Sequence, residues 1–240
     1  MAVNKTYPDL LSTLRELAAP AEFAELFLRL PRLAAAPRGS GEPVLVLPGF
    51  GGGDGSTALL RRYLAYLGYE VRGWGLGTNR GNVEELLEQL QDQVSDAATA
   101  AGQPLRLVGW SLGGYLAREV ARDLPECVDR VVTMGSPVVG GPRYTLTAPI
   151  YRLRGTDFDA IETAIRDRET VPLKVPVRAI YSRRDGIVSW EACIDRVSNC
   201  VEHIEVDASH LGMGVNPRVL DLVADALTPG TVIAHRAVPA

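Results

Sequence analysis

The stretch Leu107-Val-Gly-Trp-Ser-Leu-Gly-Gly114 places a serine between glycines, directly after an apolar run. The part from Gly109 to Gly113 fits the pattern Gly-x-Ser-x-Gly, which is typical of a sharp and strained turn between a β-strand and an α-helix. In a chain with 24 glycines, this pattern alone is a weak signal. The surrounding sequence must therefore decide whether Ser111 is a nucleophile or part of a simple turn.

Apolar segments alternate with amphipathic segments on both sides of this stretch. Short apolar runs predict strands over 44–47, 69–74, 105–108, 131–134, 177–181 and 201–206. Helical periodicity predicts helices over 56–67, 83–101, 112–124 and 219–227. The alternation predicts an α/β fold with a mostly parallel sheet of about six strands, covered by helices on both faces. Ligands of such sheets bind at the carboxyl ends of the strands.

One main domain is expected over residues 43–228 of this 240-residue chain. Residues 1–42 are predicted to form an N-terminal helical segment and linker. Within it, leucines and phenylalanines at 8–36, interrupted by Pro20 and Pro31, indicate two or three short amphipathic helices. We expect them to pack on the main domain, with a peripheral membrane or partner contact as the alternative.

Two other segments interrupt or follow the main pattern. The interval 137–172 is rich in proline, glycine and arginine and holds one expected helix, over 157–166. An insertion of this length between core strands is usually functional. Residues 229–240 are predicted to be a loosely held C-terminal tail.

Composition excludes several classes of function. The net charge of −4 provides no basic surface for nucleic acid. The N-terminus lacks a signal-peptide pattern, and no window has the roughly 18 apolar residues of a spanning helix, so we expect a soluble, cytoplasmic protein. Three cysteines are too few for a disulfide framework, although Cys193 and Cys200 could pair in an oxidising compartment. No histidine or cysteine cluster has metal-ligand spacing.

A nucleophilic serine needs a base, and the chain has three histidines. His210 follows the last predicted strand, in a loop at the sheet edge where Ser111 should also emerge. His203 lies inside that strand, where a solvated or packed imidazole is expected, and His235 lies in the tail. We therefore predict His210 as the general base.

The third member of a triad holds the histidine in the correct tautomer. Asp185 lies just beyond the strand predicted over 177–181 and reaches the same sheet edge. Among its rivals, Asp157 and Asp159 suit the start of a helix, and Asp207 suits a turn. Asp185 is thus the predicted orienting acid.

An oxyanion hole needs two backbone N–H donors aimed at the developing charge. Leu112, the residue after Ser111, provides one from the start of a helix. The loop after the first core strand, Leu47-Pro-Gly-Phe-Gly-Gly-Gly-Asp-Gly-Ser56, should provide the other, and Phe50 is the predicted donor. The loop lacks the lysine motif of a phosphate-binding loop.

Together, the Gly-x-Ser-x-Gly turn, Asp185-Gly-Ile-Val188, the Ser209-His210 loop and Leu-Pro-Gly-Phe-Gly resemble the α/β-hydrolase superfamily over about residues 43–228. Met134-Gly-Ser-Pro137 further resembles its lipase and esterase branch. The order serine, aspartate, histidine is also that of this lineage. The chain departs from the family in two ways: Pro48 replaces a common histidine, and the usual first two strands are missing. The interval 137–172 lies where the family carries its lid.

The resemblance, and the residues themselves, imply acyl transfer through an acyl-serine, without a cofactor or metal. Trp110, Gly49 and Met134 are the predicted substrate contacts. An apolar acyl group is favoured because tyrosines and leucines occur in the expected lid, so we expect a carboxylesterase or small lipase acting on a small-molecule or lipid-like ester.

Two alternatives remain open at this point. Three arginines of the insertion, Arg143, Arg152 and Arg154, suit solvated surface charges but would also suit a thioesterase or acyltransferase that acts on carrier thioesters. A non-catalytic binding module is the other alternative, since a fold does not determine its function.

Overall fold

The computed structural model describes residues 13–233, and its strands form one parallel sheet in the order β2-β1-β3-β4-β5-β6. The strands are β1 (Pro43–Leu47), β2 (Glu70–Gly73), β3 (Leu105–Trp110), β4 (Val128–Met134), β5 (Val177–Tyr181) and β6 (Val201–Glu205). The predicted α/β class and the parallel sheet of six strands are therefore confirmed. Because all the strands run in one direction, their carboxyl ends meet at one edge of the sheet.

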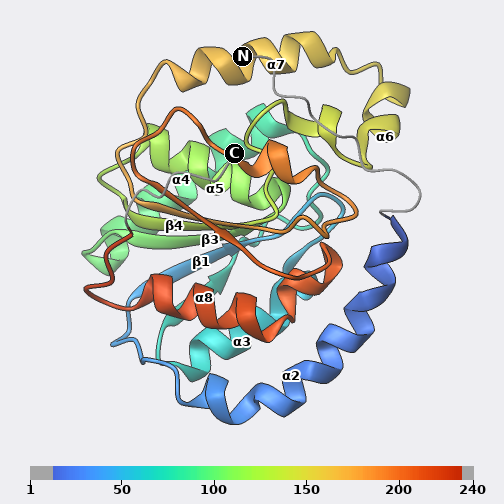
Figure 1. Cartoon of the computed structure of the whole chain (residues 1–240). Helices are drawn as coiled ribbons and strands as arrows, with labels where there is room; N and C mark the ends of the chain where they lie inside the picture. The colour runs from blue at the N-terminus through green and yellow to red at the C-terminus, as the bar shows by residue number, and fades with distance from the viewer. Residues whose placement is uncertain (1–12, 234–240) are drawn as a thin grey trace.

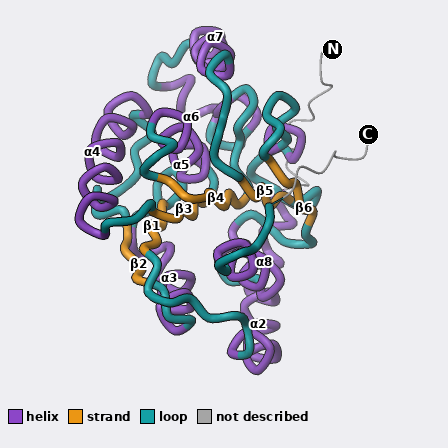
Figure 2. The backbone as a smooth tube through the Cα atoms, turned by 90° about the vertical axis from the view of Figure 1, so that its left-hand side faces the viewer, coloured by secondary structure: helices purple, strands orange, loops and turns teal. Residues whose placement is uncertain are grey.

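Helices cover both faces of the sheet, as Figures 1 and 2 show. On one face lie α4 (Val83–Ala101) and α5 (Leu112–Asp123), and on the other lie α3 (Ala58–Tyr66) and α8 (Pro217–Leu227). Each face has its own cluster of buried apolar side chains. β1 and β5 are buried along their whole length, which explains the apolar sequence of β1. β5 also buries Arg178, which is paired with Glu202 at 2.8 Å.

The sequence determines several helix boundaries locally. The Asp157 carboxylate accepts hydrogen bonds from two backbone N–H groups at the start of the helix that follows, and Asn216 does the same for α8. Gly102 ends α4 in the left-handed conformation that glycine adopts without strain. Asp157 is therefore a helix cap, as predicted when Asp185 was preferred to it as the orienting acid.

The N-terminal segment differs from its prediction. A short 3-10 helix (Arg15–Ala18) leads into one continuous helix, α2 (Ala19–Ala34), where breaks at Pro20 and Pro31 were expected. Pro20 lies in the first turn, where the missing N–H donor is not needed. Pro31 lies in the last turn, and burial of Leu26 and Leu33 in the cluster that includes α8 stabilises the helix despite the lost hydrogen bond. The expected helical residues before Thr13 lie outside the described residues.

The insertion at 137–172 contains a 3-10 helix (Gly141–Tyr144), α6 (Ala148–Leu153) and α7 (Phe158–Glu169). Only α7 corresponds to a predicted helix, since α6 is too short to show a helical period in the sequence. The base of the insertion is joined to the loop after β5, because Leu146 N–H donates to Ile187 O at 2.8 Å. The insertion therefore lies at the carboxyl edge of the sheet.

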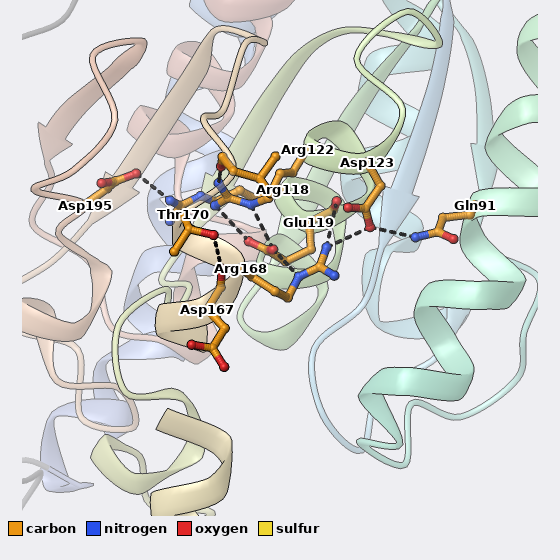
Figure 3. A network of polar contacts seen from close by, with 10 residues as sticks. Gln91, Arg118, Glu119, Arg122, Asp123, Asp167, Arg168, Thr170 and Asp195 are labelled. Atoms are coloured by element: carbon orange, nitrogen blue, oxygen red, sulfur yellow. Dashed lines mark hydrogen bonds and ion pairs between the residues drawn. The ribbon is translucent and has the colours of Figure 1, made fainter. Parts of the chain in front are cut away.

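Helix α5 lies between the sheet, α4 and α7, and three of its charged residues, Arg118, Glu119 and Arg122, are buried. Figure 3 shows how these charges are paired. Glu119 accepts hydrogen bonds from Arg122 at 3.0 Å and from Arg168 of α7 at 2.6 Å, while Arg118 pairs with Asp195 at 2.5 Å. Buried charges are tolerated only when they are paired, so this network holds α5 to α7 and to the segment before β6.

Replacing Glu119 with alanine should leave two arginine side chains without their shared carboxylate, and Arg122 is buried. Breaking such a buried pair costs about 3–5 kcal/mol of unfolding free energy. Urea titration should show this loss. Glu88→Ala, on the exposed side of α4, is the control and should change the unfolding free energy by no more than about 0.5 kcal/mol. Equal effects of the two substitutions would contradict a stabilising role for the network.

Candidate active site

The sequence-predicted site residues come together at the carboxyl edge of the sheet. Ser111 directly follows β3, at the centre of the sheet. Asp185 lies in the loop after β5, and His210 lies in the loop after β6. The glycine-rich loop follows β1, the neighbour of β3. The chain therefore delivers four separate segments to one edge.

Ser111 occupies a strained turn. Its φ of 56° and ψ of −125° are unusual for a residue with a side chain, and within residues 13–233 it is the only non-glycine residue with a positive φ. Its N–H donates to Met134 O at 2.8 Å. Helix α5 then passes so close to β1 that a Cβ atom on Gly113 would lie 2.5 Å from Leu47 O. Only glycine fits there.

Asp185 and His210 form a buried pair. Asp185 Oδ2 lies 2.6 Å from His210 Nδ1. The other oxygen, Oδ1, accepts hydrogen bonds from the N–H groups of Ile187 at 2.9 Å and Val188 at 2.7 Å. These two bonds fix the rotation of the carboxylate. The geometry suits a proton on His210 Nδ1, which leaves Nε2 as an acceptor.

The environment of His210 favours its charged form. Burial disfavours the imidazolium, but the negative charge of Asp185 and the hydrogen bond to it outweigh burial, with a smaller contribution from Glu16. The pKa of His210 is therefore raised above its usual value near 6.5. A base of this kind accepts a proton readily at neutral pH.

Ser111 is a close neighbour of this pair. Gly135 follows Met134, whose carbonyl accepts the Ser111 N–H, and a Cβ atom on Gly135 would lie 3.0 Å from both Asp185 Oδ2 and His210 Nδ1. From the other side, the ring of Trp110 lies 6.0 Å from the His210 ring, measured between centroids. The turn at Ser111 and the Asp185–His210 pair thus both adjoin the end of β4.

The loop after β1 passes directly beside Ser111. A Cβ atom on Gly49 would lie 3.0 Å from Ser111 Cβ and 3.6 Å from its Oγ. Phe50 is the next residue, and Leu112 is the first residue of α5. The two predicted N–H donors therefore belong to segments that border Ser111.

Asn79 holds this loop, and sequence reasoning missed it. Its side chain is fully buried and donates from Nδ2 to Pro48 O at 3.0 Å. Its backbone N–H donates to Gly52 O, and its carbonyl accepts from Gly51 N–H, both at 2.8 Å. The available signal was a polar residue that follows β2 at the carboxyl edge.

The predicted substrate contacts occupy different positions. Trp110 and Gly49 are partly exposed beside Ser111. The side chain of Met134 is fully buried in the core, so this residue contacts Ser111 through its carbonyl group. Tyr151 of α6 packs on the ring of Phe50, with 5.3 Å between centroids. Helix α6 therefore covers the loop after β1.

The rival residues have other partners. His203 Nε2 accepts the Asp195 N–H at 3.0 Å. Asp159 pairs with Arg143, and Asp207 pairs with Arg184 at 2.8 Å. His235 lies outside the described residues.

The insertion's three arginines have partners as well. Arg143 also contacts Glu162 at 3.0 Å, and Arg152 lies over the ring of Phe158. Arg154 lies over the ring of Phe50, 5.5 Å from its centroid. Arg154 is therefore the one of the three that adjoins the loop beside Ser111.

Metal-ligating groups, thiols and cavities are the other features of residues 13–233 that could bear on chemistry. Within residues 13–233, no group of three His, Cys, Asp or Glu side chains is arranged to hold a metal ion. The three cysteines are free thiols in the structure. A cavity of about 320 Å³ lies at the opposite edge, lined by the first residues of β1 and the last turns of α4.

Comparisons with known proteins agree on the architecture. No protein-family model matches the chain. The mitochondrial palmitoyl-protein thioesterase ABHD10 of Bos taurus is 26% identical over 209 residues, which cover 74% of this chain and 68% of that protein.

In the part of the chain that the structure describes, no helix is both long and apolar enough to cross a membrane.

Two solved structures illustrate the likeness in fold. One belongs to the pair of metagenome-derived lipolytic enzymes LipS and LipT, with a TM-score of 0.58 and 18% identity over 80% of this chain and 93% of its own. The other is α/β hydrolase domain-containing protein 10 from mouse, with a TM-score of 0.53 and 21% identity over 77% of this chain and 88% of its own. Together with the parallel sheet and the strained turn at Ser111, these likenesses show that the chain has the α/β-hydrolase fold that its sequence resemblance predicted.

Proposed function

We propose that this protein is a serine hydrolase that cleaves carboxylic esters of apolar acyl groups through an acyl-serine intermediate. The observation that carries the proposal is the buried 2.6 Å contact between Asp185 Oδ2 and His210 Nδ1, beside the strained turn at Ser111. A serine hydroxyl is activated when a histidine, itself oriented by a carboxylate, lies next to it. Here the serine lies at the carboxyl edge of the sheet.

In the proposed acylation step, Ser111 Oγ attacks the carbonyl carbon of the ester while His210 Nε2 takes the hydroxyl proton. Asp185 stabilises the imidazolium that forms. When the tetrahedral intermediate collapses, the bond to the leaving oxygen breaks and His210 donates its proton to that oxygen. An alcohol leaves, and the acyl group stays on Ser111.

In the proposed second step, His210 takes a proton from water as the water oxygen attacks the acyl carbonyl. The bond to Ser111 Oγ then breaks, His210 returns its proton to Oγ, and a carboxylic acid leaves. The N–H groups of Leu112 and Phe50 are the proposed donors to the negative oxygen in both steps. The support for Phe50 is its place after Gly49, which borders Ser111.

The proposal of an apolar acyl group rests on the side chains around Ser111. Trp110, Phe50 and Tyr151 provide aromatic surface beside the serine. Ile150 and Leu153 are exposed apolar residues on α6, the helix whose Tyr151 packs on Phe50. Sites for small molecules are predominantly apolar with a few placed polar groups, which suits this combination.

A thioester substrate is the second candidate. It is favoured by the likeness to ABHD10, whose name describes a palmitoyl-protein thioesterase, at 26% identity. The chemistry of Ser111 and His210 is the same for both, except that a thiol leaves in place of an alcohol. The two candidates therefore differ in the leaving group that the site accepts.

A fluorophosphonate probe should form a covalent adduct on Ser111, because the probe reacts with a serine that a neighbouring base activates. Mass spectrometry of the labelled protein identifies the modified residue. Ser111→Ala should remove the adduct. Ser40 is an exposed serine in the segment before β1, and Ser40→Ala should keep the adduct. The absence of an adduct in the native protein, or an undiminished adduct in Ser111→Ala, would refute the serine mechanism and favour a binding module.

The rate of probe labelling should fall at acidic pH, with a midpoint above 6.5. His210 acts as a base only when it is neutral, and a raised pKa moves the loss of the neutral form to higher pH. Asp185→Asn removes the charge that raises this pKa, so the midpoint should move to lower pH while the rate drops, on the order of 10⁴-fold. A midpoint that stays in place in Asp185→Asn would argue against His210 as the base.

A matched panel of p-nitrophenyl esters and acyl-CoA thioesters, from two to sixteen carbons, separates the two candidate substrates. We expect hydrolysis of the esters, with kcat/KM rising with chain length, because each buried methylene contributes about 0.8 kcal/mol. Ser111→Ala provides the background rate. Turnover of acyl-CoAs alone would replace the ester proposal with the thioester one.

A further inference from the structure

Glu16, in the N-terminal segment, reaches the two loops that carry Asp185 and His210. Its side chain is buried, with a relative exposure of 9%. Oε1 accepts hydrogen bonds from the backbone N–H groups of Gly186 at 2.8 Å and His210 at 2.9 Å. Oε2 accepts from the N–H of Leu211 at 2.8 Å. One carboxylate therefore satisfies three backbone donors.

These contacts restrain the backbone beside both members of the pair. Gly186 is the residue after Asp185, and the other two donors are His210 itself and its successor. Since both loops bind the same carboxylate, movement of one loop away from the other breaks at least one charge-assisted hydrogen bond. The His210–Asp185 distance thus depends on a group from outside both loops.

We propose that Glu16 is a positioning residue for the Asp185–His210 pair: its carboxylate joins their two loops and so holds the two side chains in place. This inference rests on the proposed serine-hydrolase function. Glu16 does not touch the reacting atoms in this proposal. It acts through the position and the electrostatics of His210.

The charge of Glu16 also acts on His210. The carboxylates of Asp185 and Glu16 both raise the pKa of His210, against the effect of burial. Burial holds the pKa of the nearby Cys193 thiol well above its usual value, so this thiol stays neutral. The other charged side chains of the packed segments make contacts of their own: Arg15 with Arg183 O, Arg183 with Glu205, Arg184 with Asp207, and Glu22 with Ser209 N–H and Asn216.

The test uses the full chain and compares Glu16→Gln with the native protein. Glutamine keeps the size of the side chain, but it lacks the charge, and its NH₂ group would face a backbone N–H. We expect kcat for ester hydrolysis to fall by about 10- to 100-fold, as for a small misplacement of a catalytic group. The acidic midpoint of the pH profile should move to lower pH, because a negative charge that favours the imidazolium is lost.

Three other variants separate positioning from general stability. Glu16→Asp keeps the charge on a side chain too short for all three donors, so its midpoint should stay near the native value while kcat falls. Glu22→Gln weakens the neighbouring contact to Ser209 N–H at 2.8 Å, and its midpoint should not move. Glu25→Gln removes an exposed carboxylate of α2 and should change neither kcat nor the midpoint.

Nuclear magnetic resonance titration of the His210 ring in Ser111→Ala provides a readout that does not depend on activity. Introducing Glu16→Gln into this background should lower the measured pKa of His210. An unchanged pKa and pH profile, or an equal shift in Glu22→Gln, would overturn the inference. If the native protein forms no probe adduct on Ser111, the proposed function itself is refuted. If the native protein is labelled but Glu16→Gln changes neither kcat nor the pKa of His210, only the role of Glu16 is refuted.

Discussion

The close approach of α5 to β1 is the constraint on which the rest of the structure depends. At Gly113 the separation leaves no room for a side chain, since a Cβ atom there would lie 2.5 Å from Leu47 O. This approach brings the first N–H groups of α5 and the loop after β1 to the same side of Ser111. It also encloses α5 between the sheet and its neighbouring helices, so Glu119 and Arg118 must be paired inside the protein.

Around Ser111, remote polar side chains hold the backbone of otherwise irregular loops. Asn79 binds the loop that contains Gly49, and Glu16 binds the loops that contain Asp185 and His210. Loops lack the regular hydrogen bonds of helices and strands, so their buried backbone groups need such partners. These partners make the edge of the sheet a fixed arrangement of four segments.

The strands, and the placement of Ser111, Asp185 and His210 at one edge of the sheet, could be predicted from the sequence because both follow from local patterns. Short apolar runs mark buried strands, and a parallel sheet brings the residues after each strand to one edge, so Asp185 and His210 could be found by their place in the chain. Helix α6 was missed since its six residues show no period. The helix break expected at Pro31 was wrong because tertiary burial of Leu33 outweighs the loss of one hydrogen bond. Glu16 has no local pattern, since its partners are distant in the sequence. The place of Asn79 after β2 is a signal, but it does not reveal the bond to Pro48.

The contacts of Glu16 also bear on when, during synthesis, the carboxyl edge of the sheet can form. Its bonds to Gly186 and His210 join residues that are 170 and 194 positions apart in the chain. Contacts between such distant residues are gained only after the entropy of closing a long loop has been lost. During synthesis Glu16 and Ser111 leave the ribosome long before His210 does. A growing chain therefore holds the serine and this carboxylate without their partners, and the edge of the sheet acquires its final geometry only when the last part of the chain has emerged.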